Sequence, residues 1–327
     1  MATYKGIKGV KVVTKTADPT ASEADGTVWY NTPADALKYS IASAAAWAAA
    51  PNMVVGRNRL GGCGTSTAGL AVGGFPPGGA PNVALCEEYN GTAWAEVNNY
   101  PVGTQSPGMA GTQTAALFIS GGNYSPLASH KYDGTSWTAT GTRNTTGVLR
   151  CQGCGTQTAA MTTAGEVSGY VQGTETFDGS TWTELTNYPI ATSEVQVMGT
   201  STLAIGVGGY PGAPAGKLGT DWDGTSWTAG TNCNTGRTEF GSSHVGAPST
   251  DAVIFGGNVP PHTANTEVWN GSSWTEVGDM ATSRSQLASG GAITSAIAIG
   301  GSVGGTISNA TEVFSDAPYT IKTVTIS

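Results

Sequence analysis

The chain has 327 residues, of which 49 are glycine and only 11% are charged, and its formal net charge is −8. This glycine-rich, charge-poor composition excludes the charge-rich disordered class and favours short strands joined by tight turns. The acidic balance argues against nucleic-acid binding, which needs a basic surface, and no apolar run reaches the ~20 residues of a membrane span.

The first 41 residues are predicted to form an attachment arm that ends in a β-hairpin. Four lysines precede the first acidic residue, so the arm is basic on an otherwise acidic chain: Lys5, Lys8, Lys11 and Lys15. They also interrupt the apolar run that a signal peptide would need, so no such peptide is expected. Residues 27–30 and 37–40 are predicted to be the two strands of the hairpin.

From residue 42 onward, a repeat predicts a β-propeller. Six tryptophans recur 43 to 47 residues apart, and strand-like units with a period in the forties are typical of propeller blades. Each repeat is expected to hold four strands, a to d, of which strand d begins at the tryptophan. An Asp-Gly or Asn-Gly dipeptide between strands c and d favours a tight hairpin turn. The tryptophans are Trp47, Trp94, Trp137, Trp182, Trp227 and Trp274.

The order of the units predicts how the ring closes. Trp47 precedes the first complete unit, and the last strand c, at 311–314, has no tryptophan after it. The simplest closure has six blades, the last of which takes its strand d from around Trp47. The alternatives are that residues 319–326 supply that strand, or that seven blades form. The predicted domains are therefore 1–41, the arm and hairpin, and 42–327, a propeller closed by its N- and C-terminal strands.

The repeat resembles the kelch motif over about residues 57–317. The resemblance lies in a glycine pair, an aromatic residue and a tryptophan after the turn, as at Gly256, Gly257, Trp269 and Trp274. It implies an all-β, kelch-like propeller, a fold that serves oxidases, adaptors and scaffolds alike. The hairpin segment and the repeated Gly-Thr-Gln-Thr-Ala-Ala at 111–116 and 155–160 resemble tail-fibre and virion proteins of marine tailed bacteriophages.

Residues that could carry chemistry do not converge in the sequence. His130, His244 and His262 lie in unrelated repeats, so the copper site of oxidases that share the kelch motif is not expected. Cys151 and Cys154 form a lone CxxC pair, which favours core packing over redox or zinc chemistry. We therefore expect no metal, no cofactor and no enzymatic activity. The five cysteines, an odd number, predict no disulfide framework.

Variation between the repeats is concentrated in the b–c and d–a loops, which share one face of a propeller. Loops on a rigid scaffold carry binding specificity, so this face is expected to recognise a partner. The candidate contacts are Phe75, Tyr124, Tyr210 and His262, because aromatic rings suit stacking on sugars. The alternative is that these loops pack only on one another or on a virion neighbour. The d–a loops also contain Arg143, Arg237 and Arg284.

Together these observations predict a non-enzymatic virion protein, assembled in the host cytoplasm. It would be a tail-fibre or receptor-binding component that recognises a host surface glycan or protein. Its N-terminal arm would bind other virion proteins, and it would be a homo-oligomer on the particle. A capsid-decorating or tail-wall protein without a receptor is the alternative. A cellular kelch-like carbohydrate-binding protein or oxidase is the alternative from another class.

Overall fold

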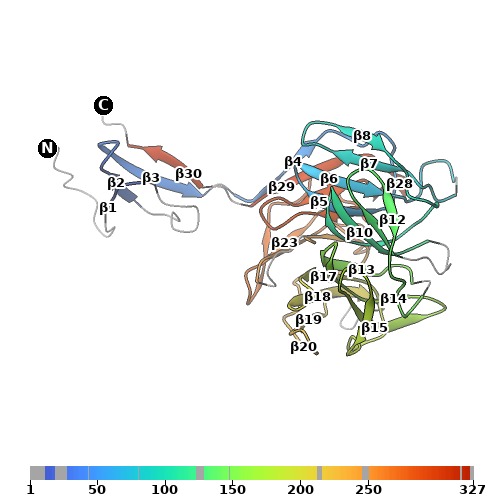
Figure 1. Cartoon of the computed structure of the whole chain (residues 1–327). Coiled ribbons are helices and arrows are strands. Elements are labelled where there is room, and N and C mark those ends of the chain that lie inside the picture. The colour runs from blue at the N-terminus through green and yellow to red at the C-terminus, as the bar shows by residue number, and fades with distance from the viewer. Residues whose placement is uncertain are drawn as a thin grey trace. The chain divides into compact units, whose positions relative to one another are not determined.

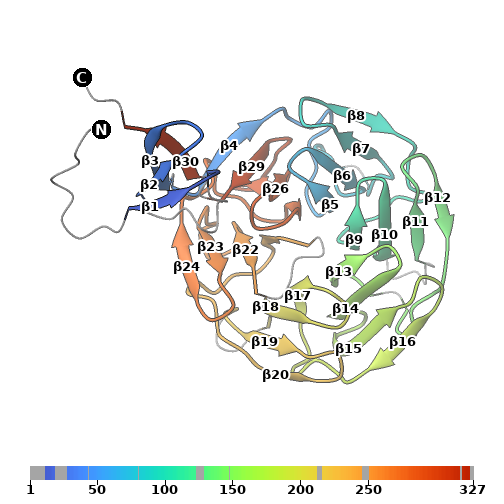
Figure 2. The same cartoon turned by 60° about the vertical axis from the view of Figure 1, so that its left-hand side comes forward.

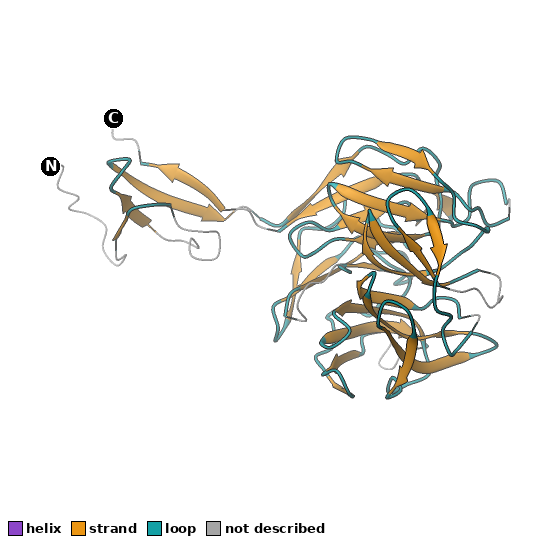
Figure 3. Cartoon of the chain, in the orientation of Figure 1, coloured by secondary structure: helices purple, strands orange, loops and turns teal. Residues whose placement is uncertain are grey.

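The computed structural model describes residues 12–18, 28–42, 44–79, 81–122, 129–146, 148–211, 216–244, 250–316 and 319–324. All regular secondary structure in these ranges is β-strand, and no helix there is long and apolar enough to cross a membrane (Figure 3). The strands form seven four-stranded sheets and one two-stranded hairpin. The chain divides into two compact units: Ala46–Phe314, and Met1–Ala45 together with Ser315–Ser327.

The larger unit is a β-propeller of six four-stranded blades around one axis (Figure 2). The innermost strands a are β5 (Gly61–Thr65), β9 (Gly108–Thr112), β13 (Gln152–Thr156), β17 (Ser193–Gly199), β21 (Gly241–Ser242) and β25 (Ala288–Gly290). Strands b are β6 (Ala68–Val72), β10 (Ala115–Ser120), β14 (Ala159–Glu166), β18 (Ala204–Tyr210), β22 (Ala252–Phe255) and β26 (Ile297–Ile299).

Outside these lie strands c and d, in the same blade order. Strands c are β7 (Cys86–Tyr89), β11 (His130–Tyr132), β15 (Tyr170–Phe177), β19 (Gly219–Trp222), β23 (Thr266–Trp269) and β29 (Thr311–Ser315). Strands d are β8 (Trp94–Val97), β12 (Trp137–Ala139), β16 (Trp182–Leu185), β20 (Trp227–Ala229), β24 (Trp274–Val277) and β4 (Ala46–Ala50). A small hairpin in the last blade joins β27 (Ser302–Val303) to β28 (Thr306–Ile307).

The ring closes through the sixth blade, as predicted. Its sheet has the order β25-β26-β29-β4, so its outermost strand comes from the N-terminal side of the chain. The ring centroids of Trp47 and Phe314 lie 5.2 Å apart, which completes the blade with aromatic residues from distant parts of the chain. The innermost strands contact one another in order, and β25 contacts β5. The six-blade prediction is therefore confirmed, and the seven-blade alternative is wrong.

The recurring tryptophans hold each blade together and fix it to its neighbour. In five blades the aromatic residue that ends strand c lies opposite the tryptophan that begins strand d, with ring centroids 4.8 to 5.3 Å apart. Four indole N–H groups also donate to a hydroxyl group at strand c of the preceding blade: Trp47 to Thr266, Trp94 to Thr311, Trp182 to Ser129, and Trp227 to Thr174. These tryptophans are therefore scaffold residues.

Glutamine in the turn between strands a and b makes a second link between blades. Gln113 Nε2 donates to the carbonyl oxygens of Gly69 and Tyr89 in the first blade, at 3.0 and 2.8 Å. Gln157 repeats this contact one blade later, on the carbonyls of Ala116 and Tyr132. The Gly-Thr-Gln-Thr sequence thus joins adjacent blades as well as turning the chain.

We expect Gln113→Ala to lower the free energy of unfolding by about 2 kcal/mol, because it removes two hydrogen bonds of about 1 kcal/mol each. Urea denaturation followed by tryptophan fluorescence measures the change. Ser66→Ala is the matched control, since Ser66 occupies the corresponding turn of the first blade and its side chain makes no hydrogen bond there. Equal effects of the two substitutions would contradict the link.

Four buried arginine–glutamate pairs connect the d–a loops to strand c of the blade that follows. Arg57, Arg237 and Arg284 each donate to a strand c glutamate and to two backbone carbonyls of that blade. Arg143 reaches Glu175 through its Nε, at 3.0 Å. The other pairs are Arg57–Glu87, Arg237–Glu267 and Arg284–Glu312, at 2.9, 2.6 and 2.8 Å. These four arginines are therefore buried and are not available as contacts on the surface.

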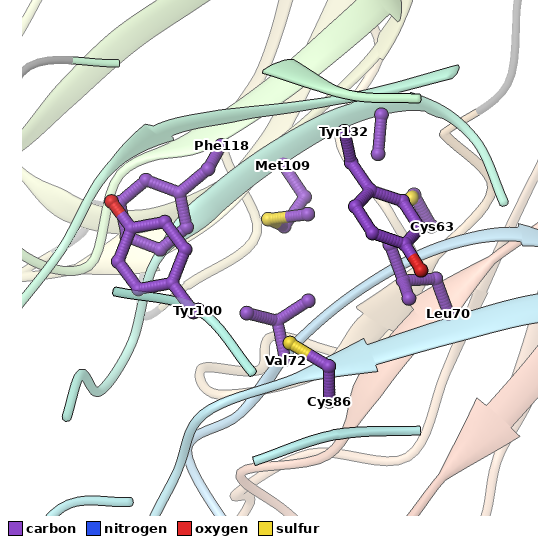
Figure 4. Packing of buried hydrophobic residues seen from close by; sticks show 9 residues of the cluster. Cys63, Leu70, Val72, Cys86, Tyr100, Met109, Phe118 and Tyr132 are labelled. Atoms are coloured by element: carbon purple, nitrogen blue, oxygen red, sulfur yellow. The ribbon is translucent and has the colours of Figure 1, made fainter. Parts of the chain in front are cut away.

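Small and sulfur-containing side chains fill the space between blades. Cys63 and Cys86 pack with Met109 and the stacked rings of Tyr100 and Phe118, whose centroids are 4.1 Å apart (Figure 4). All five cysteines are buried and unpaired, and burial raises the pKa of the Cys63 thiol to about 12. The prediction that Cys151 and Cys154 pack in the core is confirmed.

The second strand of the third blade differs from its prediction. Its single glycine predicts a weaker strand, but β14 is eight residues long and pairs with β15 along most of its length. A bulge between Thr163 and Gly165 places Ala164 at φ 57°, which replaces the turn made by the missing glycine. The hairpin therefore extends as far as Glu166 and Tyr170.

The smaller unit is a four-stranded sheet with the order β1-β2-β3-β30 (Figure 1). Its strands are β1 (Val13–Lys15), β2 (Val28–Asn31), β3 (Ala36–Ala42) and β30 (Tyr319–Thr323). The predicted N-terminal hairpin is confirmed as β2 and β3. The predicted boundary is wrong at the other end, because β30 pairs with β3 and so leaves the propeller. The Asp18 carboxylate accepts hydrogen bonds from Trp29, Asn31 and Lys38.

Candidate functional site

The predicted contact residues lie in loops of different blades and do not form one site. Among the described residues, no ring contact or hydrogen bond joins Phe75, Tyr210 and His262 to one another. Phe75 pairs with Asn58 in an isolated bridge and is half-buried. His262 is also partly buried. Tyr124 lies outside the described residues.

Tyr210 is the predicted contact that the structure places at an exposed position with an aromatic partner. Its side chain is 51% exposed, and its ring meets that of Tyr170, which is 38% exposed, edge to face at 5.9 Å. The sequence places Tyr170 in a b–c loop, but Tyr170 was not among the predicted contacts. Two exposed tyrosines that support each other form an apolar platform on the b–c face.

A second feature of this face is a ring of six residues around the propeller axis, one from each blade. Five of them lie two residues before strand a, and Glu194 is the second residue of β17. Each has a positive φ between 44° and 62°, a conformation that is uncommon outside glycine. Because six equivalent non-glycine residues share this conformation, it is a regular feature of the fold and not a distortion of one loop. We name them the axial residues: Arg59, Ser106, Arg150, Glu194, Glu239 and Gln286.

Backbone hydrogen bonds join the axial residues around the ring. The N–H of each donates to the carbonyl of the axial residue in the preceding blade, at 2.7 to 3.1 Å in five of six steps. Arg59 donates to Gln286, which closes the circle between the first and last blades. The structure shows no such bond at the step from Glu239 to Glu194, both of which are described. The fourth and fifth blades are therefore held less tightly at the axis.

The axial side chains pair with one another. Arg150 Nη1 lies 3.1 Å from Glu194 Oε1 and 3.6 Å from a carboxylate oxygen of Glu166, at the end of β14. Arg59 Nη2 lies 3.7 Å from Glu239 Oε1, to which Gln286 Nε2 donates at 2.8 Å. The planar polar groups are thus held in defined orientations before any ligand arrives.

The axial residues form the rim of a cavity of about 450 Å³, including its open mouth. We name this cavity the central pocket. Gln152 and Gln196 supply amide groups to its wall, and the apolar part of the wall comes from Leu60, Pro107, Phe240 and Leu287. Gln196 is almost fully buried and its Oε1 accepts a hydrogen bond from Ser242. Next to it lies His244, whose burial lowers its pKa to about 4, so the imidazole is neutral.

Glu194 has the most perturbed carboxyl group of the central pocket. Burial, followed by the negative charge of Glu239, raises its pKa to about 7, and Arg150 opposes the shift. Its side chain is 11% exposed. A carboxyl group of this kind is partly protonated near neutral pH and can both donate and accept hydrogen bonds.

The platform of Tyr170 and Tyr210 adjoins the central pocket. Tyr170 pairs in register with Glu166, and Tyr210 pairs in register with Ser193, the residue before Glu194. The platform and the central pocket therefore share one face. Among the described residues, no group of three or more His, Cys, Asp or Glu side chains could hold a metal ion.

Sequence reasoning missed the axial residues, although a signal for them exists. In five repeats the axial residue stands two residues before strand a, and in the fourth repeat it is the second residue of that strand. The next residue along the chain is buried in every repeat: Leu60, Pro107, Cys151, Val195, Phe240 and Leu287. A polar residue before a buried one at the same position of every repeat marks this site. Because the six residue types differ, a search for residues that recur in every repeat does not detect them.

Comparison with known proteins supports the fold alone. No family model and no curated protein matches the chain. The solved structure of YjhT is similar, with a TM-score of 0.66 and 13% sequence identity, over 84% of this chain and 99% of that one. At this identity the similarity concerns the architecture, which is that of a β-propeller.

Proposed function

We propose that the protein is a non-enzymatic virion component of a tailed phage whose propeller binds a host surface glycan. The observation that carries the binding role is the meeting of an exposed tyrosine platform with a preorganised polar pocket on one face. Aromatic rings stack on the apolar faces of sugars, and planar carboxylate, guanidinium and amide groups bind their hydroxyl groups. The virion role is supported by the sequence resemblance and by the separate terminal unit.

The path of the chain through the propeller favours this division of roles. The chain enters at the start of β4 and leaves at the end of β29, which is the end of the sixth blade where the c–d turns of the other blades lie. The central pocket opens at the opposite end, among the d–a loops. A protein fixed through its termini can thus keep the binding face free.

We expect Tyr170→Ala and Tyr210→Ala each to weaken binding to host cells about tenfold, because each removes an aromatic contact worth roughly 0.5–1.5 kcal/mol in addition to its buried area. Binding of the fluorescently labelled protein to cells measures the effect. Leu203→Ala is the control: Leu203 is 48% exposed but lies in an a–b turn, on the opposite face. Unchanged binding by both tyrosine variants would exclude the platform.

We expect a deletion of residues 2–11 to abolish incorporation into particles without unfolding the protein. The deletion removes three of the four leading lysines and ends before β1 and Asp18, so the terminal sheet keeps its strands. Mass spectrometry of purified particles gives the copy number. A variant that is incorporated normally would refute docking through the arm. Normal incorporation together with an absence of cell binding by the intact protein would favour a decorating protein without a receptor.

A further inference from the structure

The charged groups in and beside the central pocket do not balance. Two guanidinium groups of the pocket lining, from Arg59 and Arg150, face three carboxylates: Glu194 and Glu239 in the lining, and Glu166 beside it, 3.6 Å from Arg150. The other titratable groups around the pocket are the tyrosine hydroxyls of the platform and His244 beside Gln196, whose imidazole is neutral. When all five charged groups are ionised, one negative charge has no cation of its own.

The excess charge falls on Glu194. Glu239 has Arg59 and the amide of Gln286 as partners, whereas Glu194 shares Arg150 with Glu166. Glu194 also stands at the one step of the axial ring that lacks a backbone hydrogen bond, beside Glu239. Its nearly complete burial leaves little water to stabilise the charge.

A ligand that covers the mouth of the pocket would remove the remaining water. Burying an unpaired carboxylate is costly, and a proton on Glu194 removes that cost by leaving two guanidinium groups opposite two carboxylates. An anionic ligand would add to the negative charge, so it is disfavoured. A hydroxyl-rich ligand adds no charge, and its hydroxyl groups both donate to and accept from Gln152, Gln196 and a protonated Glu194.

We propose that the central pocket binds an uncharged, hydroxyl-rich sugar, and that it does so in the form in which Glu194 carries a proton. This inference rests on the proposed glycan-binding function and specifies the ligand class and its coupling to pH. Binding is then strongest below neutral pH and weakens as Glu194 ionises.

The test uses the full-length protein on an array of immobilised neutral, uronic-acid and amino-sugar oligosaccharides, at pH 5.5 and pH 8.5. We expect neutral sugars to bind, and to bind at least tenfold more tightly at pH 5.5, since a group that titrates near pH 7 is almost fully ionised at pH 8.5. Glu194→Gln, which mimics the protonated form, should bind equally at both values. Glu184→Gln, on the exposed side of β16, is the control and should behave as the unaltered protein does.

Two results would overturn the proposal: a preference for acidic or amino sugars, and neutral-sugar binding that is stronger at pH 8.5 or independent of pH. A protein that binds no sugar at either pH contradicts the proposed function itself. In that case the protonation of Glu194 is measured without a ligand, by a ¹³C NMR titration of its side-chain carboxyl group. The Glu194→Gln variant identifies which signal belongs to Glu194. A midpoint near neutral pH supports the protonated pocket, and a midpoint below about 5, the range of ordinary glutamates, refutes it.

Discussion

Replacing Arg237 by alanine should destabilise the propeller by about 3–5 kcal/mol, the cost of leaving one member of a buried ion pair without its partner. Arg237 is completely buried, and its guanidinium binds Glu267 at 2.6 Å and the carbonyls of Gly256 and Asn265. The substitution leaves a buried carboxylate and two carbonyls that lose their donors. Urea denaturation at pH 7, followed by tryptophan fluorescence, gives the free energy of unfolding.

Two further variants test whether the loss of stability comes from the buried ion pair. Arg59→Ala removes an arginine whose side chain is 30% exposed and 3.7 Å from its partner, so it should cost less than 1 kcal/mol. Adding Glu267→Gln to Arg237→Ala should recover at least about 1 kcal/mol, because the unpaired charge disappears. The amide oxygen can still accept from one of the N–H groups of Asn234 and Thr235, which bind different oxygens of Glu267. If Arg237→Ala costs no more than Arg59→Ala, the pair does not fasten the blades.

Between pH 5 and pH 8, ionisation of Glu194 should lower the free energy of unfolding of the unaltered protein by about 2–3 kcal/mol. The Glu194→Gln variant should not show this loss. The pKa of Glu194 is about 7 in the folded protein and near 4.5 in an unfolded chain, so the folded state binds more protons between these values. This contribution to stability is complete below about pH 4.5 and is lost as the pH rises through 7. Glutamine cannot ionise, so the variant lacks this loss.

Thermal and urea unfolding between pH 4.5 and pH 8.5 measure the difference between the two proteins, which cancels the titration of all other groups. Glu184→Gln is again the control, because Glu184 is exposed and its replacement should leave the pH profile unchanged. A difference that stays constant across the range would mean that Glu194 titrates as an ordinary carboxylic acid, and the pocket would then hold its excess charge in another way.

The sequence predicts the repeating parts of the fold because they depend on short-range patterns. The turn dipeptides, the aromatic pairs across strands c and d and the position of Trp47 ahead of the first blade are sufficient for the six-bladed ring. The assignment of the C-terminal tail fails, because an alternating strand does not specify which edge it will join. Strand β30 pairs with β3, and its sequence suits either edge equally well.

The site was predictable only in part. Loop variation points to the face that holds the central pocket, and Tyr210 lies on it in a variable loop. Phe75 and His262 are partly buried, and no ring contact among the described residues joins them to Tyr210 or to each other. The central pocket depends on six residues that are brought together only when the ring closes, and they share a backbone conformation and not a residue type. The buried role of Arg237 and Arg284 was hidden for a similar reason, since each is paired with a glutamate of the blade that follows.

The sixth blade has a consequence for the order in which the molecule is made. Its outer strand is among the first parts of the propeller to leave the ribosome, and its other three strands are among the last. Five blades can therefore fold in sequence as the chain emerges, while β4 waits for β29 through nearly the whole of synthesis. The central pocket is completed only at that final step, because Arg59 and Gln286 meet across the closing seam. Partly synthesised chains thus carry most of the scaffold but no finished pocket.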